Sequence, residues 1–199
     1  MSTVPEVILA SASPRRAGIL RAAGVPFAAV PPTIDDADLE VRPGDAAGFT
    51  MALAWLKARN VLASGRVPRG ARWVVAADTL CVRDGVLVGK PAGPEEARAM
   101  VEGFAGRGHE VVTGVCVVEV ASGARRLAAD EARVTLGELG VSAIDRHVAS
   151  GAWRGKSGGY NYFDCVDAGW PLRCDGDPET VVGLPSRIVL PLVGRGGRA

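Results

Sequence analysis

Near its N-terminus the chain reads Val7-Ile8-Leu9-Ala10-Ser11-Ala12-Ser13-Pro14-Arg15-Arg16, an apolar run followed by a small-residue turn and two arginines. The run at residues 7–10 has the length of a short buried strand. Ser13 is a favourable N-cap and Pro14 a favourable first helical residue, so a helix is expected to start here and to stop at Gly24. A strand that leads directly into a helix is typical of α/β proteins.

The same turn has the chemistry of an anion site. Amide groups at a helix N-terminus have no partners within the helix, and the helix dipole places positive charge there. The hydroxyls of Ser11 and Ser13 add donors, and Arg15 and Arg16 add fixed charge. The alternative interpretation is a well-capped helix with two solvated arginines.

The rest of the chain alternates between strand-like and helix-like patterns, which predicts an α/β fold. Extended segments are expected at residues 25–30, 73–77, 80–82, 86–88, 109–120, 125–136 and 180–182. Helices are expected at residues 44–64, 94–104 and 142–150, the last with an acidic capping box made by Ser142 and Asp145 and an end at Gly151. Residues 33–40 and 152–171 show no clear period, and the final element is expected to be broken by Pro191.

Composition excludes several classes of protein. The 199 residues include 23 basic and 22 acidic side chains, and this balance disfavours a broad nucleic-acid-binding face. No apolar run approaches the ~20 residues of a membrane span, and the first residues lack the basic segment of a signal peptide. We therefore expect a cytoplasmic protein, in which the four cysteines, none with CxxC spacing, stay reduced.

Asp78 directly follows the apolar segment at residues 73–77. Ligands of open α/β sheets bind at the carboxyl ends of strands, so Asp78 could hold a metal ion or activate water. The alternative is an aspartate that only forms a turn.

Only three of the 23 basic residues are lysines, namely Lys57, Lys90 and Lys156. Lysine acts as a compact point charge at phosphate sites and is not interchangeable with arginine there. Lys156 lies in a glycine-rich segment, residues 153–163, that also holds four of the ten aromatic side chains. Such a segment could stack on a base, or it could be a local aromatic core beneath a loop.

These features together favour a small anionic, aromatic ligand. Its phosphates would lie beside Asp35, Asp36 and Asp78, which requires a divalent cation between the negative groups. Oxygen ligands of this kind suit Mg²⁺ or Mn²⁺.

The assembled motifs resemble the Maf family of nucleoside triphosphate pyrophosphatases, over roughly residues 7–192. The matching segments occur in the family's order: Leu9 to Arg16, Ala77-Asp78-Thr79, Gly89-Lys90-Pro91, Thr113-Gly114-Val115, Gly155-Lys156-Ser157-Gly158-Gly159-Tyr160 and Val182-Gly183-Leu184-Pro185. The length of the chain predicts a single domain over residues 1–193, and residues 194–199 are expected to form a flexible tail. The resemblance implies an elongated α/β fold, a mixed sheet flanked by helices around a central nucleotide cleft, and a homodimer.

The activity implied by the resemblance is hydrolysis of a nucleoside triphosphate to the monophosphate and pyrophosphate, in nucleotide clearing or arrest of cell division. Asp78 would be the general base, and Asp36 and Asp78 would hold the divalent metal. The implied substrate-binding residues are Ser11, Ser13, Arg15, Arg16, Lys57, Thr79, Lys90, Lys156 and Phe163.

The base of the nucleotide is left open by departures from the family pattern. Relatives that prefer dTTP and UTP carry the two arginines, Asp-Thr, and a glutamine three residues after the motif tyrosine. This chain keeps Arg15 and Thr79, but Phe163 replaces the glutamine, and residues 164–178 also differ. The alternatives are therefore dTTP and UTP, 7-methyl-GTP, a broad base specificity, or a nucleotide-binding regulator of cell division without catalysis.

Overall fold

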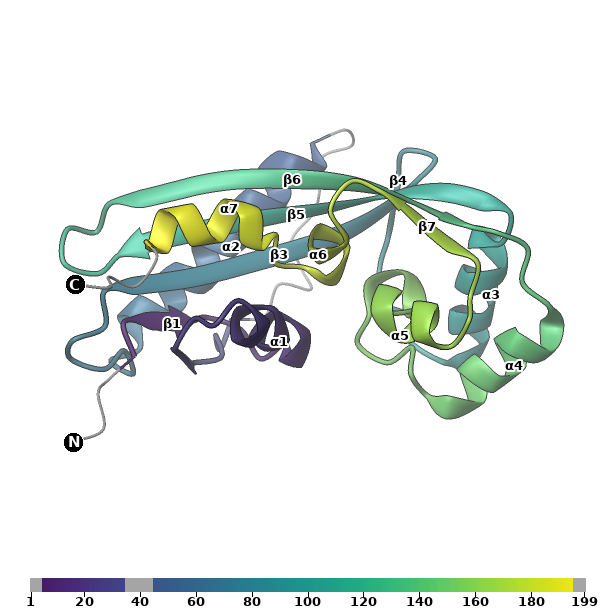
Figure 1. Cartoon of the computed structure of the whole chain (residues 1–199), viewed down its shortest axis with the longest axis horizontal. Coiled ribbons are helices and arrows are strands. Elements are labelled where there is room, and N and C mark those ends of the chain that lie inside the picture. Colours follow the sequence, from purple (N-terminus) through teal and green to yellow (C-terminus); the bar gives the residue numbers. More distant parts are fainter. Residues whose placement is uncertain (1–4, 35–44, 195–199) are drawn as a thin grey trace. The chain divides into compact units, whose positions relative to one another are not determined.

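A computed structural model describes residues 5–34 and 45–194 (Figure 1). Predictions for Asp35, Asp36 and Asp38, and for the tail beyond Gly194, lie outside the described residues. Within them, the elements in chain order are β1 (Val7–Leu9), α1 (Pro14–Ala22), β2 (Phe27–Ala29), α2 (Ala46–Ala63), β3 (Trp73–Arg83), β4 (Val86–Val88), α3 (Pro94–Phe104), β5 (Arg107–Glu119), β6 (Arg125–Leu136), α4 (Val141–Ser150), the 3₁₀ turn η1 (Ser157–Gly159), α5 (Tyr162–Asp167), β7 (Leu172–Asp175), α6 (Pro178–Val182) and α7 (Ser186–Val193).

The strands of the described residues form one seven-stranded mixed sheet, which confirms the predicted α/β class. The order is β2-β1-β3-β5-β6-β7, with β4 paired to β3. Strand β1 is parallel to both β2 and β3, whereas the β3–β4 and β6–β7 pairs are antiparallel. None of the helices in the described part of the chain is long and apolar enough to cross a membrane.

The chain divides into two compact units. Unit 1 comprises Met1–Asp78, Thr113–Asp130 and Gly183–Ala199, and unit 2 comprises Thr79–Val112 and Glu131–Val182. Strand β3 passes from unit 1 to unit 2 between Asp78 and Thr79, and β5 and β6 likewise contribute residues to both units.

The core of unit 1 forms where α2 covers the sheet. Ala54, Ala58 and Val61 lie on one face of α2 and pack with Ile8 of β1 and Val74 of β3. Close approach of helix and sheet needs a residue without a side chain, and Gly114 of β5 provides it. A Cβ at position 114 would lie 2.3 Å from the backbone nitrogen of Met51 in α2, which explains the glycine of the Thr113-Gly114-Val115 motif.

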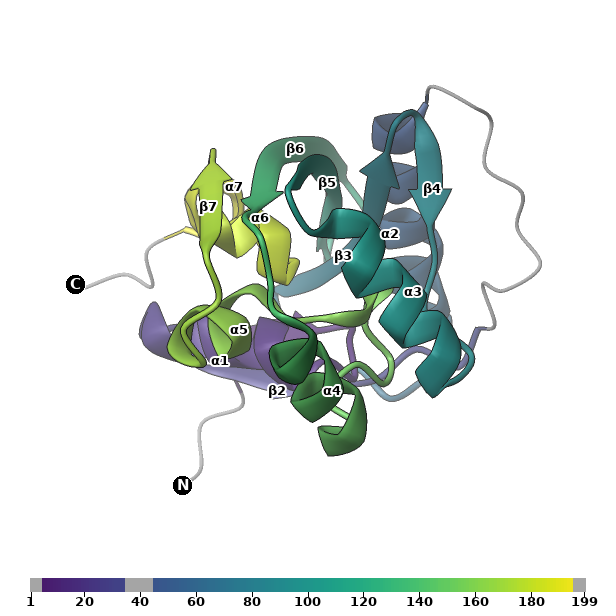
Figure 2. The same ribbon diagram turned by 90° about the vertical axis from the view of Figure 1, so that its right-hand side faces the viewer.

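The core of unit 2 is built from β3, α3, α4 and the segment after η1. Helices α3 and α4 lie side by side (Figure 2), and Arg98 of α3 forms an ion pair with Asp145 of α4. The buried side chains here are Cys81, Val101, Phe104, Leu136, Ile144, Tyr160, Cys165 and Trp170.

Several predicted elements are wrong in detail. Residues 180–182 are helical, because Asp177 accepts a hydrogen bond from the Glu179 amide at 2.9 Å and Pro178 starts α6. The capping box of Ser142 and Asp145 is absent from α4, whose N-cap is Gly140. The two expected strands at 73–77 and 80–82 are one strand, β3.

The last helix also differs from expectation. Pro191 lies inside α7 instead of breaking it, and Val189 and Val193 are buried on either side of it. Burial of these side chains outweighs the one backbone hydrogen bond that a proline removes. By contrast, the end of α4 at Gly151, with a φ of 69°, confirms the prediction.

Candidate active site

The first predicted element of the site, the serine turn, forms as expected in unit 1. The Ser13 hydroxyl accepts a hydrogen bond from the Arg16 amide at 3.4 Å and caps α1, which begins at Pro14. The Ser13 amide donates to the hydroxyl of Ser11 at 3.1 Å, and Ser11 is buried. The two hydroxyls therefore brace the turn at the N-terminus of α1, where an anion would be favoured.

Arg16 connects this turn to a distant motif of the same unit. Its Nε donates to the carbonyl of Gly183 at 2.8 Å, and its Nη1 lies 3.4 Å from the Ser11 hydroxyl. The interpretation of Arg16 as a solvated arginine is wrong, because two of its nitrogens have protein partners. Arg15 lies beside it on α1 and is half-buried.

Lys57 of α2 and Asp78 of β3 form an ion pair between Nζ and Oδ1, which is the central feature of unit 1. Both side chains are largely removed from solvent, with exposed fractions of 14% for Lys57 and 10% for Asp78. A pair in this environment is screened less than a surface pair, so Lys57 fixes the orientation of the carboxylate.

The position of Asp78 within its strand differs from the prediction. Strand β3 continues to Arg83, so Asp78 lies inside the strand and neither at its end nor in a turn. The strand continues because residues 81–83 pair with β4. Thr79 follows Asp78 directly and is half-buried, and successive residues of a strand point to opposite faces.

The two other predicted lysine segments meet in unit 2. The amide of Gly158 donates to the carbonyl of Gly89 at 3.0 Å, so the turn η1 is joined to the segment of Lys90. Gly158 has a φ of 74°, and a Cβ there would lie 3.3 Å from the Phe104 ring. The Lys90 side chain is exposed.

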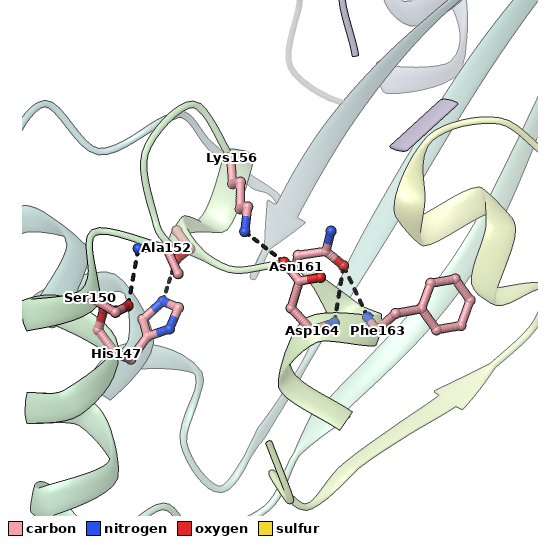
Figure 3. A network of polar contacts seen from close by, with 8 residues as sticks. His147, Ser150, Ala152, Lys156, Asn161, Phe163 and Asp164 are labelled. Carbon is pink, nitrogen blue, oxygen red and sulfur yellow. Dashed lines mark hydrogen bonds and ion pairs between the residues drawn. The ribbon is translucent and has the colours of Figure 1, made fainter. Parts of the chain in front are cut away.

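Lys156 is held by a carboxylate that the sequence did not point to (Figure 3). Its Nζ lies 2.9 Å from Oδ2 of Asp164 on α5. The side chain of Asn161 caps the same helix, accepting from the amides of Phe163 at 3.0 Å and Asp164 at 3.5 Å. The Phe163 ring points away from Lys156, and 42% of Phe163 is exposed.

The aromatic segment forms the local core that was one of its two predicted roles. Trp153 and Tyr160 are buried, and the Tyr160 hydroxyl lies 2.8 Å from Nε2 of His109, as in a local core. Phe163, in contrast, is exposed, and stacking on a base stays a prediction for it.

The sequence analysis did not single out either histidine, although both form polar contacts with the aromatic segment. His109 contacts Tyr160, and Nε2 of His147 lies 2.8 Å from the carbonyl of Gly159. Both residues are buried. The one feature of the sequence that could have drawn attention to them is that the chain has only two histidines. Neither position belongs to a recognisable catalytic pattern.

A metal ion would find few protein ligands among the described residues. These contain no group of three or more His, Cys, Asp or Glu side chains placed to hold one. Asp78 offers a buried carboxylate of the oxygen type that Mg²⁺ and Mn²⁺ accept, and Mg²⁺ is commonly held by one or two carboxylates together with substrate phosphates. Asp36, the other predicted ligand, lies outside the described residues.

The mixed sheet, the braced helix N-terminus and the buried Lys57–Asp78 pair together define an α/β protein suited to a phosphate-bearing ligand. The chain belongs to the Maf family, since a family model described as Maf-like protein matches residues 6–195. The resemblance inferred from the motifs is thereby confirmed.

Relatives of known name cover nearly the whole chain. It is 38% identical over 182 residues to a dTTP/UTP pyrophosphatase of Salinibacter ruber, an alignment that covers 91% of this chain and 86% of the relative. It is 38% identical over 181 residues to a dTTP/UTP pyrophosphatase of Symbiobacterium thermophilum, covering 90% and 88%. A nucleoside triphosphate pyrophosphatase of Nocardia farcinica is 33% identical over 194 residues, covering 94% and 91%.

Proposed function

We propose that this protein is a nucleoside triphosphate pyrophosphatase that hydrolyses dTTP and UTP to the monophosphate and pyrophosphate, with Asp78 as the general base. The enzyme class rests on family membership and on relatives named dTTP/UTP pyrophosphatase or nucleoside triphosphate pyrophosphatase that align with at least 90% of the chain. The observation that carries the assignment of Asp78 is its buried ion pair with Lys57.

In this mechanism Asp78 accepts a proton from the attacking water. The water oxygen forms a bond to the α-phosphorus, and the bond from that phosphorus to the oxygen bridging to the β-phosphorus breaks, so pyrophosphate leaves. Such a reaction depends mainly on positioning and on neutralising the phosphate charge. Arg15, Arg16, Lys57 and Lys90 carry the positive charges for this task, and the hydroxyls of Ser11 and Ser13 hold the turn on which Arg15 and Arg16 lie.

A divalent cation, Mg²⁺ or Mn²⁺, belongs to this proposal, and the carboxylates of Asp78 and Asp36 would hold it. When bound, it would neutralise negative charge on the phosphate oxygens. Lys57 orients the Asp78 carboxylate through Oδ1. A homodimeric state stays a prediction that follows from the family resemblance, and a cytoplasmic location stays a prediction that follows from the sequence features described above.

The preference for dTTP and UTP is supported by the names of the relatives and by Arg15 and Thr79, which match that subgroup. Phe163 departs from it, because an aromatic ring cannot form hydrogen bonds with a base edge. An exposed ring offers a stacking face, which tolerates any base. We therefore expect dTTP and UTP to be substrates, with weaker discrimination against other bases than a glutamine would give.

The proposal is tested by measuring pyrophosphate release from dTTP, UTP, CTP, 7-methyl-GTP and the purine triphosphates, with Mg²⁺ or Mn²⁺. Asp78→Asn keeps the size of the side chain and removes the base, so kcat should fall by about 10²- to 10⁴-fold while nucleotide still binds. Asp84→Asn is the matched control, because Asp84 is an exposed turn residue with a φ of 52° that asparagine also adopts.

Two results would overturn the proposal. Full activity of Asp78→Asn would remove Asp78 as the base. Binding of nucleotides by a folded wild-type protein that releases no pyrophosphate would favour a non-catalytic regulator instead.

A further inference from the structure

Lys156 is engaged by a residue of the segment that departs from the family pattern. The Lys156 side chain is only 12% exposed, whereas that of its partner Asp164 is 60% exposed. The ammonium group is thus the more enclosed member of the pair. The Asp164 carboxylate also places a negative charge beside Lys156, and this charge disfavours a triphosphate at that position.

Helix α5 needs an interaction such as the ion pair with Lys156 to hold it in place. It has six residues, fewer than a helix needs to be stable by itself, and its one buried side chain is Cys165. Two polar interactions secure its first turn, the Asn161 cap and the ion pair of Lys156 with Asp164. Phe163 lies between the cap and the ion-paired residue in sequence, so both interactions restrain its backbone (Figure 3).

The turn η1, which follows Lys156 directly, is itself held in place within unit 2. The Gly158 amide donates to the Gly89 carbonyl, and the Gly159 carbonyl lies 2.8 Å from the His147 ring. Lys156 therefore extends from a rigid turn to a weakly supported helix. The ammonium group of Lys156 can therefore hold α5 in position, whereas α5 contributes little to the position of Lys156.

We propose that Lys156 is a positioning residue, which holds α5 through Asp164 and thereby sets the orientation of Phe163 for base recognition. This inference rests on the proposed function, because it assigns the base contact to Phe163. It replaces the expectation that Lys156 binds the triphosphate. Lys156 then affects which bases are accepted, while the other positive groups bind the phosphates that all substrates share.

The decisive comparison is between Lys156→Met and Asp164→Asn. If Lys156 acts through Asp164, both variants lose the same contact, and both should change the ratio of kcat/KM between dTTP and the purine triphosphates by a similar factor, about threefold to fivefold. The double variant Lys156→Asp with Asp164→Lys should restore the wild-type ratio. Glu110→Gln is the control, since it removes a different ion pair of unit 2, that of Glu110 with Arg133, and neither residue belongs to α5.

A triphosphate-binding lysine would give the opposite pattern. Lys156→Met would then raise KM for every nucleotide by one common factor. Asp164→Asn would release the ammonium group and lower KM, and the exchanged pair would remain defective. That pattern would overturn the inference.

A second measurement needs no activity. The amides of Phe163 and Asp164 donate to Asn161, so their hydrogen exchange reports the first turn of α5. Exchange should become about threefold to fivefold faster in Lys156→Met and in Asp164→Asn, and should stay unchanged in Glu110→Gln. Unchanged exchange in both variants would refute the positioning role. If the wild-type protein hydrolyses no triphosphate, the proposed function fails, yet these rates still decide whether Lys156 holds α5.

Discussion

His109 is a buried titratable side chain outside the residues assigned to the reaction. It is 1% exposed, its ring packs on Phe104 with ring centroids 4.2 Å apart, and Nε2 lies 2.8 Å from the Tyr160 hydroxyl. Burial, together with the positive charges of Arg83 and Arg133, lowers the pKa of His109 from 6.5 to about 4. Nδ1 has no hydrogen-bond partner among the described residues. The ring is therefore neutral in the folded protein at pH 7.

This lowered pKa predicts a loss of stability in mild acid. Between pH 6.5 and about 4 the unfolded chain binds a proton at His109 that the folded protein does not, so the free energy of unfolding falls as the pH falls. The contribution is fully present above pH 6.5 and should decrease by about 2 kcal/mol by pH 5. Urea unfolding at pH 7 and pH 5 measures it. His109→Gln should show a smaller decrease than wild type, and equal decreases in the two proteins would contradict the prediction.

At the scale of single residues, the sequence predicted which side chains stand out better than it predicted which residues they contact. The Ser13 cap was predicted because a helix start is encoded locally, and the three lysines stood out against 20 arginines. The contacts of Arg16 with Gly183 and of Lys156 with Asp164 were not predicted. The first joins residues 167 positions apart, and the second depends on a short helix without its own periodic pattern.

At the scale of elements, α2 and β5 approach each other closely at Gly114. Gly114→Ala would place a Cβ 2.3 Å from backbone atoms of α2, which cannot move like the end of a flexible side chain. The free energy of unfolding should fall by about 3 kcal/mol or more, because helix and strand must separate. Chemical denaturation of the variant measures this loss.

Gly18→Ala provides the control for this prediction. Gly18 lies in α1, and a Cβ there would have nothing within 4 Å. Alanine should therefore stabilise the protein by up to about 1 kcal/mol through helix propensity. A Gly114→Ala protein as stable as Gly18→Ala would show that α2 does not pack on β5 as described.

Long elements were easier to predict than short ones. The periodic pattern over α2 and the terminal signals of α3 predicted both helices almost to the residue, and β6 matches its predicted range of 125–136. Short elements differ because tertiary contacts outweigh weak local signals. Strand β7, with four residues, was missed, and it forms because it pairs with β6 at Leu136 to Arg133.

At the scale of the whole molecule, the two units share three strands. β3, β5 and β6 each contain residues of both units, so one unit cannot lose its strands without disturbing the other. We expect a single cooperative unfolding transition for the chain.

The cysteines allow this cooperativity to be measured. Burial raises the pKa of Cys116 in unit 1 and of Cys165 in unit 2 to about 11, so both thiols should react slowly in the folded protein. Cys174 is the least buried of the four and should be labelled first. Labelling at increasing urea, followed by peptide mass spectrometry, should expose Cys116 and Cys165 at the same midpoint. Labelling of one at clearly lower urea would show that its unit unfolds separately.

The hydrogen bond between the Gly158 amide and the Gly89 carbonyl has a consequence for how this protein can change over generations. Because both partners are main-chain atoms, no substitution removes the carbonyl, and only proline at position 158 removes the amide. The neighbouring Lys90 and Lys156 can therefore be replaced, and new residues tried in their places, while the connection between the two segments is inherited intact. Substitutions at these two positions can therefore change the contacts of their side chains while η1 stays joined to the segment of Lys90.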